Sequence, residues 1–175
     1  IEAYKKEFKF KGLHVIRPAN IYGPYANFNP KNSMVVASII RRVVEGENPL
    51  KVWGDGKAIR DFIYSEDVAD AIIKVINNNI QVPINVGSGK GTTIKKLVSE
   101  IVNCSKIKFK PKVIFEKSKK SGGKVGDRKR VLNVKLARKY NIKNKINLSK
   151  GLMYTIDWYL KNKKRLNSRF DYFAK

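Results

Sequence analysis

Residues 60–76 read RDFIYSEDVADAIIKVI, and this stretch indicates the fold class of the chain. Arg60 to Tyr64 form a short run that predicts a strand, and Ser65 is a plausible N-cap for the helix that follows. After Ser65, apolar residues recur at helical spacing over 68–76. Acidic residues fill the first helical turns, where the helix dipole favours negative charge. The stretch therefore predicts a strand that leads directly into a helix.

The same alternation of short strands and helices extends along the chain. Further strands are predicted at 13–16, 50–53, 83–86, 109–115 and 131–132. Further helices are predicted at 1–8 and 34–45, after Thr92 or Thr93, after residue 132, and after Ser149 as N-cap. Residues 19–33 are predicted to form a long irregular loop, a length that favours a functional role, and a Gly/Ser/Lys-rich loop precedes Asp127. Short strands alternating with helices indicate an α/β protein.

Composition limits the classes of protein to which the chain can belong. The 175 residues include one cysteine and one histidine, which can form neither an internal disulfide nor a structural zinc site. No apolar run approaches the roughly 18 residues that a membrane span needs. The opening residues lack the apolar core of a signal peptide. We therefore expect a cytoplasmic protein without a metal site.

The net charge of +24 is distributed unevenly, with +5 on residues 1–104 and +19 on residues 105–175. A basic carboxyl-terminal half suits a module that binds nucleic acid or another polyanion. The alternative is a lysine-rich surface that is merely solvated. Lys outnumbers Arg 29 to 9, and Arg is the residue of bidentate phosphate contacts. The solvated surface is therefore the favoured interpretation, and nucleic acid is not the expected partner.

The stretch 86–97, VGSGKGTTIKKL, has the glycines of a phosphate loop but not its pattern. Lys90 is followed by Gly91, where a Walker A loop has Ser or Thr. A tight strand-to-helix connection with a threonine cap is the favoured interpretation. His14 and Cys104 are likewise predicted to be structural.

A set of residues in or near the predicted loops suits an anionic ligand. The candidates are Asn20, Tyr22, Asn32, Arg42, Arg60 and Arg130. A guanidinium presents a fork of donors that matches a diphosphate, and each charge-assisted bond contributes about 1.5 to 3 kcal/mol. The carboxylates of Asp61 and Asp67 are interpreted as belonging to a strand end and a helix start, not to an acid–base pair.

Four blocks of sequence, in order, resemble a known family. They are RPANIYGPYANFNPKNSM at 17–34, VWGDGKAIRDFIYSEDVADAI at 52–72, INVGSGKGTTIKKLV at 84–98, and GDRKRVLNVKLAR at 126–138 with LSKGLMYTIDWYL at 148–160. They resemble the carboxyl half of the NAD-dependent epimerase/dehydratase family, extended short-chain dehydrogenases that act on nucleotide sugars. The resemblance implies that residues 1–175 hold the end of a Rossmann-type parallel sheet and a small C-terminal substrate-binding domain.

The resemblance also implies roles for particular residues. Pro18 and Ala19 resemble the segment that passes beside the nicotinamide of NAD or NADP, and Asn20 resembles a partner of the substrate diphosphate. Asn32 resembles a contact of the nucleotide sugar, and Arg42 resembles a phosphate ligand.

Two cationic positions complete the expected diphosphate site. Arg60 resembles the arginine that pairs with the diphosphate, and Arg130, or its neighbour Lys129, resembles a second cationic clamp. The implied substrate is a nucleotide-diphosphate sugar, and the implied assembly of a full-length protein is a homodimer.

The sequence departs from the family pattern in two respects. It shows no Gly-rich dinucleotide fingerprint, and its first residues lack the Tyr-x-x-x-Lys pair, since Tyr4 is followed four residues later by Phe8. We therefore expect residues 1–175 to be a fragment without catalytic residues, inactive alone. Met34 stands where the fucose-synthase branch has a catalytic histidine, so 4-epimerase, 4,6-dehydratase and reductase activities stay open. The alternatives are a polyanion-binding module and a fragment that is unstable because its sheet has an unpaired edge.

Overall fold

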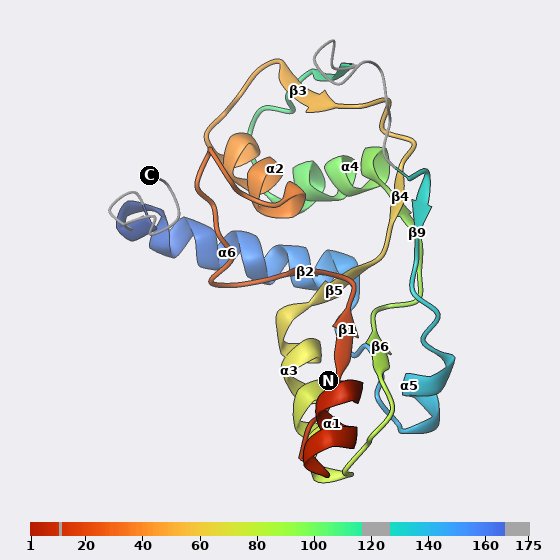
Figure 1. The fold of residues 1–175 in the computed structure, drawn as a ribbon. Coiled ribbons are helices and arrows are strands. Elements are labelled where there is room, and N and C mark those ends of the chain that lie inside the picture. The colour runs from red at the N-terminus through yellow and green to blue at the C-terminus, as the bar shows by residue number, and fades with distance from the viewer. Residues whose placement is uncertain (11, 117–126, 167–175) are drawn as a thin grey trace.

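The fold is that of a computed structural model of the chain, which describes residues 1–10, 12–116 and 127–166 (Figure 1). The helices of this part are α1 (Glu2–Phe8), α2 (Val35–Val44), α3 (Ser65–Asn77), α4 (Ile94–Cys104), α5 (Lys135–Lys139) and α6 (Leu148–Leu166). The strands are β1 (Ile16–Pro18), β2 (Asn20–Tyr22), β3 (Leu50–Trp53), β4 (Ile59–Arg60), β5 (Phe62–Tyr64), β6 (Ile84–Val86), β7 (Thr92–Thr93), β8 (Val113–Glu116) and β9 (Lys129–Arg130).

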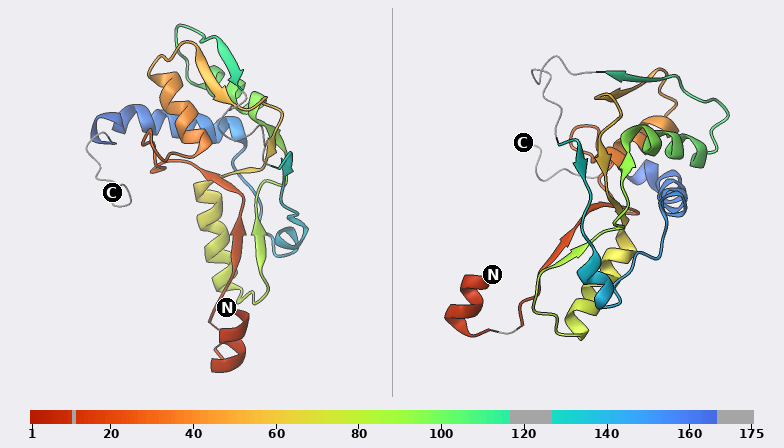
Figure 2. Two further views of the ribbon diagram at one scale, coloured as in Figure 1. Left: turned by 45° about the horizontal axis from the view of Figure 1, so that its top comes forward. Right: turned by 90° about the vertical axis from the view of Figure 1, so that its right-hand side faces the viewer.

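The strands pair mostly in parallel and join distant parts of the sequence. Three pairs are parallel and two-stranded: β1 with β6, β2 with β5, and β3 with β8. A fourth sheet has the order β7-β4-β9, with β4 antiparallel to β7 and parallel to β9. These three short strands lie side by side on one flank of the molecule (Figure 2). The predicted α/β class is confirmed.

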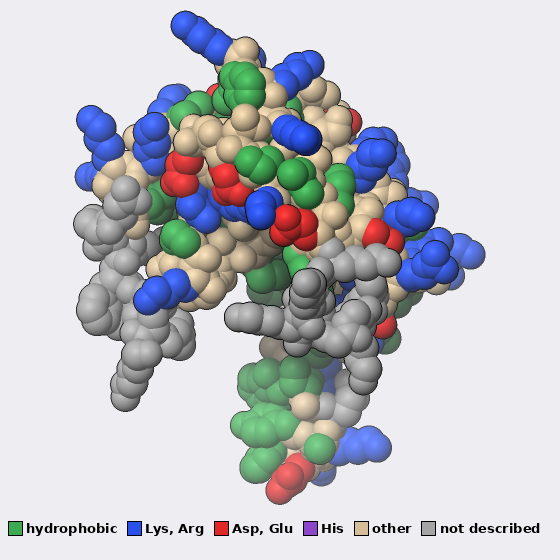
Figure 3. All heavy atoms as spheres, turned by 90° about the horizontal axis from the view of Figure 1, so that it is seen from above, with side chains coloured by type: hydrophobic (Ala, Val, Ile, Leu, Met, Phe, Trp, Pro, Cys, Tyr) green, Lys and Arg blue, Asp and Glu red, His purple; other side chains and the backbone are tan. Residues whose placement is uncertain are grey.

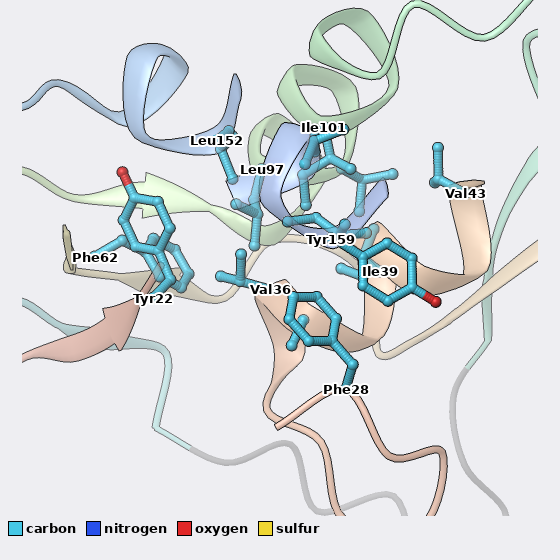
Figure 4. Packing of buried hydrophobic residues seen from close by; sticks show 14 of the residues in the cluster. Tyr22, Phe28, Val36, Ile39, Val43, Phe62, Leu97, Ile101, Leu152 and Tyr159 are labelled. Carbon is cyan, nitrogen blue, oxygen red and sulfur yellow. The ribbon is translucent and has the colours of Figure 1, made fainter. Parts of the chain in front are cut away.

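Two clusters of buried apolar side chains organise the elements. The larger cluster joins α2, α4 and α6 to β2, β3 and β5, and the smaller one joins α3 and α5 to β1 and β6. Figure 1 shows α2 and α4 above α6, with α3 and α5 lower down beside β1 and β6. In the larger cluster, Phe28 stacks on Tyr159 with their ring centroids 4.5 Å apart (Figure 4). Among the described residues, no helix combines the length and apolarity needed to cross a membrane.

The predicted strand at 60–64 is wrong as one unit, because Asp61 divides it into β4 and β5, which pair with different strands. Asp61 is 1% exposed, and its carboxylate accepts hydrogen bonds from distant donors. The Ser88 N–H (2.9 Å), the Ser88 hydroxyl (2.5 Å) and the Gly89 N–H (3.1 Å) bond to it. The Leu132 N–H lies 3.4 Å away on the other side. Asp61 therefore fastens the loop after β6 and the segment after β9 to the junction of β4 and β5.

Asp67 fastens the start of α3 in the same manner. It is 4% exposed and accepts the backbone N–H groups of Lys145 (3.0 Å) and Ile146 (3.1 Å) and the side-chain amide of Asn144 (2.9 Å). The predicted N-cap role of Ser65 is wrong, since the cap residue is Tyr64 and no side chain caps the helix. The interpretation of Asp61 and Asp67 as structural residues agrees with these contacts.

Some predicted element boundaries shift. The predicted loop 19–33 contains strand β2, because its backbone pairs with β5. The first predicted strand, 13–16, is displaced to β1, the strand at 109–115 is shortened to β8, and the strand at 131–132 is displaced to β9. The predicted Gly/Ser/Lys-rich loop lies outside the described residues except at its ends.

The caps of two helices were predicted with different success. Asn147, and not Ser149, accepts the Lys150 N–H (2.9 Å) at the start of α6. The Ser149 hydroxyl instead donates to Glu100 on α4 (2.6 Å). The predicted Thr cap of α4 is confirmed, since the Lys96 N–H donates to Thr93 Oγ1 (3.1 Å).

Replacing Asp61 with Ala should lower the free energy of unfolding by about 3 kcal/mol or more. The change leaves backbone donors of Ser88, Gly89 and Leu132 without their acceptor, and each buried unpaired donor costs about 1 to 3 kcal/mol. Urea unfolding followed by circular dichroism measures the effect. Asp55→Ala is the control, since its exposed carboxylate accepts the Lys57 N–H in a surface turn. Equal stability of the two variants would contradict the role of Asp61.

Candidate functional site

Arg60 and Arg130 lie opposite each other on the neighbouring strands β4 and β9. Both are held by Asp127: the Arg60 guanidinium donates to the Asp127 carbonyl oxygen (2.8 Å), and Arg130 Nε donates to the Asp127 carboxylate (2.6 Å). The hydrogen bond from Arg130 is the foremost reason that the pKa of Asp127 is lowered. The structure therefore brings the two predicted arginines together around one acidic residue, as a pair of cations suited to an anion with two charges.

Asn20 is connected to the segment that carries Arg60 through hydrogen bonds to the backbone of Asp61. Its backbone N–H and its side-chain amide both donate to the Asp61 carbonyl oxygen, at 3.1 Å and 2.7 Å. Since Asp61 directly follows Arg60 in the chain, Asn20 joins the same region. These hydrogen bonds fix the orientation of the Asn20 side chain before any ligand arrives.

Pro18 and Ala19 lie at the carboxyl end of β1, next to the carboxyl end of β6. The Ala19 N–H donates to the Val86 carbonyl oxygen (2.8 Å), and Pro18 is exposed. In open α/β sheets, ligands bind in the crevice outside the carboxyl ends of parallel strands. The position of these two residues therefore fits contact with a cofactor, and that role stays a prediction.

Asn32 and Arg42 lie in other surroundings. Asn32 accepts a hydrogen bond from the Asn27 amide (2.7 Å) in the loop before α2. Arg42 donates through two guanidinium nitrogens to the carboxylate of Glu47 and also to the Lys51 carbonyl oxygen. The hydrogen bond between Arg42 and Glu47 is the foremost reason that the pKa of Glu47 is lowered. Arg42 is thus tied to the connection between α2 and β3, and its role toward a phosphate stays a prediction.

Tyr22 is a core residue, and the prediction that it contacts an anionic ligand is wrong. It is 3% exposed, and its hydroxyl donates to the Leu148 carbonyl oxygen (3.3 Å) at the start of α6. Burial is the foremost cause of its raised pKa. A Cβ at Gly151 would lie 2.3 Å from the Tyr22 hydroxyl oxygen, so α6 can approach this close only with glycine at that position.

A pocket of about 300 Å³ opens at the carboxyl ends of β2 and β5. Its lining comes from the loop after β2, the start of α2, the start of α3 and the middle of α6, and the residues used below are Tyr25, Asn27, Met34 and Ser65. Gly23 lets the loop cross closely over α3, since a Cβ there would lie 2.2 Å from the Ser65 hydroxyl oxygen. The sequence predicted a functional loop here, but not that α3 and α6 would close it into a pocket.

The two residues predicted to be structural have structural contacts. His14 Nδ1 lies 2.9 Å from the Ile80 carbonyl oxygen. Cys104 lies partly buried beneath Ser149, and burial is the foremost cause of its raised pKa. A raised pKa lowers the thiolate fraction at neutral pH, so Cys104 is not poised as a nucleophile.

Basic side chains are spread widely over the surface. Seen from above, they project around the margin of the molecule, and acidic side chains lie among them (Figure 3). Acidic partners pair with some of them, as Asp70 does with Lys145 and Glu116 with Lys51. On this face the excess positive charge forms no single continuous patch.

Comparison with known proteins gives a family for this geometry. Residues 1–87 match the model of the NAD dependent epimerase/dehydratase family. The chain belongs to this family. The expected resemblance is confirmed, and with it the assignment of the parallel strands to a Rossmann-type fold.

Individual relatives agree with the assignment. The chain is 33% identical to GDP-L-colitose synthase from Yersinia pseudotuberculosis over 90% of its length and 50% of the relative's. It is 30% identical to GDP-L-fucose synthase from Escherichia coli over 94% of its length and 53% of the relative's. Among solved structures, UDP-glucose 4-epimerase from Thermotoga maritima with UDP-glucose has a TM-score of 0.77 at 27% identity, covering 93% of this chain and 50% of that one. The chain spans about half the length of the curated relatives it matches.

Replacing Glu47 with Gln should destabilise the protein at neutral pH, and the difference from the unchanged protein should shrink as the pH falls. The pKa of Glu47 is lowered from its usual 4.5, so its ionised form contributes stability above that value and loses it as the carboxylate becomes protonated. Thermal unfolding at a series of pH values measures the difference. Glu66→Gln, which removes an exposed carboxylate from α3, is the control for net charge. A difference from the unchanged protein that is constant with pH would contradict the coupling.

Proposed function

We propose that this chain is the nucleotide-sugar-binding part of an NAD(P)-dependent epimerase, dehydratase or reductase. The observation that carries the proposal is the pair Arg60 and Arg130 around Asp127, next to Asn20. Two adjacent guanidiniums match the two charged groups of a nucleotide diphosphate. The relatives named above make or convert sugars linked to GDP or UDP, which supports the same ligand class.

The residues divide the task of binding between them. Arg60 and Arg130 hold the diphosphate, and Asn20 donates or accepts hydrogen bonds beside it. Asn32, in the loop before α2, contacts the nucleotide sugar, and Arg42 on α2 contacts a phosphate. Pro18 and Ala19 lie against the nicotinamide, which supplies the hydride chemistry when it is bound.

The chain alone supplies binding and orientation in this proposal. The 175 residues contain no Gly-rich dinucleotide fingerprint, and their one Tyr-x-x-x-Lys spacing, Tyr159 with Lys163 on α6, has its tyrosine in the core at 3% exposure. In this proposal the proton and hydride steps therefore need residues outside them. Residues 1–175 act as one unit, the carboxyl-terminal part of a longer cytoplasmic enzyme that forms a homodimer. The length of the relatives supports a longer enzyme, since each is about twice as long as the part matched.

Arg60→Ala should weaken the binding of GDP or UDP by about ten- to a hundred-fold, because one charge-assisted interaction contributes about 1.5 to 3 kcal/mol. Isothermal titration calorimetry with each nucleotide measures the change. Arg41→Ala is the matched control, since it removes the same charge from α2, where the Arg41 guanidinium bonds to Glu45 (2.8 Å) and is 17% exposed. Equal affinities of Arg60→Ala and the unchanged chain would remove Arg60 from the site.

The same titrations separate the proposal from a polyanion-binding module. Nucleotide binding at a built site depends on Arg60 and not on Arg41. Binding of nucleic acid with a steep loss of affinity at rising salt, together with no binding of GDP or UDP, would instead identify the basic surface as the functional one.

A further inference from the structure

Tyr25 has an unusual backbone and an unusually exposed ring. Its φ angle is 64°, in the left-handed region that costs a residue other than glycine about 1 to 2 kcal/mol. The side chain is nevertheless 77% exposed, so the strained conformation buries no ring. Residues in such conformations persist only where the surrounding structure enforces them, and they cluster at ligand sites. The conformation therefore calls for a reason other than the core.

The ring of Tyr25 is held in place from one side. It lies against Trp158 on α6, with ring centroids 4.8 Å apart at 54°. Trp158 is in turn held by Phe28, which is 4% exposed and also stacks on Tyr159 (Figure 4). The aromatic group thus has a rigid base in the core and one outward ring. Tyr25 presents a positioned platform toward solvent.

This platform belongs to the pocket at the carboxyl ends of β2 and β5. The lining of the pocket includes Tyr25 and Met34, which is 65% exposed, together with Asn27 and Ser65. An aromatic wall with a few polar groups is the usual composition of a small-molecule site. A pyranose ring suits it, because its C–H faces pack on an aromatic ring while its hydroxyls form hydrogen bonds.

The pocket also lies at the right place relative to the arginine pair. Asn20 starts β2, and a strand rises about 3.3 Å per residue, so the lining from Ile21 to Gly23 begins roughly 3 to 10 Å beyond Asn20. In a nucleotide sugar the glycosyl ring is bonded directly to the diphosphate. A diphosphate held near Asn20 and Arg60 therefore brings its sugar within reach of this pocket.

We propose that Tyr25, supported by Trp158, is the platform on which the glycosyl ring of the nucleotide sugar packs, and that it determines which sugars the site accepts. This inference rests on the proposed function, and it adds a residue and a pocket for the sugar. Met34, Asn27 and Ser65 form the remaining contacts with the ring.

The experiment compares a nucleotide with its sugar conjugate. A Trp53→Phe background leaves Trp158 as the single tryptophan of the chain, so its fluorescence reports on the platform. In this background, GDP and UDP are titrated in parallel with GDP-mannose and UDP-glucose. Methyl glycosides of the same sugars are titrated at millimolar concentration. Tyr25→Ala is compared with Phe109→Ala, which removes another exposed aromatic ring.

We expect at least one nucleotide sugar to bind about five-fold more tightly than its nucleotide and to change Trp158 fluorescence. Tyr25→Ala should abolish that increment while leaving GDP and UDP affinity within two-fold, and Phe109→Ala should change neither. An increment that survives Tyr25→Ala, or no increment in the unchanged chain, overturns the platform while the diphosphate site stands.

The remaining outcomes distinguish a failure of the proposed function from a failure of the sugar platform. If GDP and UDP do not bind, the proposed function fails, and the glycosides then decide the inference alone. A Trp158 response to glycoside that disappears in Tyr25→Ala supports a sugar platform without the nucleotide. Absence of any response to nucleotide sugars and glycosides overturns it.

Discussion

The buried carboxylate of Asp61 is the interaction on which the arrangement of the site depends. It gathers donors from the loop after β6 and from the segment after β9, and it does so at the junction of β4 and β5. A carboxylate taken out of water is stable only when its oxygens are well hydrogen-bonded. The hydrogen bonds of Asp61 therefore hold three distant segments at fixed positions. Arg60, Arg130 and Asn20 are positioned by these segments. A single buried acid thus positions the segments that carry these side chains.

Close approaches of backbone then connect this region to the helical layer. Asp67 fastens α3 to the segment that leads into α6, and Gly151 allows α6 to press against the Tyr22 hydroxyl. These contacts bring β2, α3 and α6 together with the loop that begins at Gly23, and the pocket lies where they meet. Stability and site geometry thus arise from the same contacts.

The class of fold could be predicted from the sequence because alternating strands and helices leave a periodic trace. Strand β3 was predicted with its observed bounds, and Thr93 was among the predicted caps, since both depend on neighbouring residues. The break at Asp61 could not be predicted, because its cause lies at residues 88, 89 and 132. Periodicity alone does not decide which face of α3 is buried: Ile72, Ile73 and Ile76 are exposed, whereas Val68, Ala71 and Val75 are buried. Both sets have helical spacing, and only the neighbouring elements decide between them. For the site, the residue types of Arg60 and Arg130 indicated an anion-binding role. The composition of the loop 19–33 did not indicate that Tyr22 would be buried and Tyr25 exposed.

Because Asp127 contacts both arginines, a ligand at the proposed site has to compete with Asp127 for the two guanidiniums. Arg130 already donates to the Asp127 carboxylate and Arg60 to the Asp127 carbonyl oxygen, so in the proposed site an incoming diphosphate replaces or joins these oxygens. Much of the cost of ordering two long side chains is then met during folding. A singly charged anion gains little by taking the place of a carboxylate of equal charge, whereas a group with two or more charges gains from both arginines at once. In the proposed diphosphate site, Asp127 would therefore favour multiply charged ligands over singly charged anions.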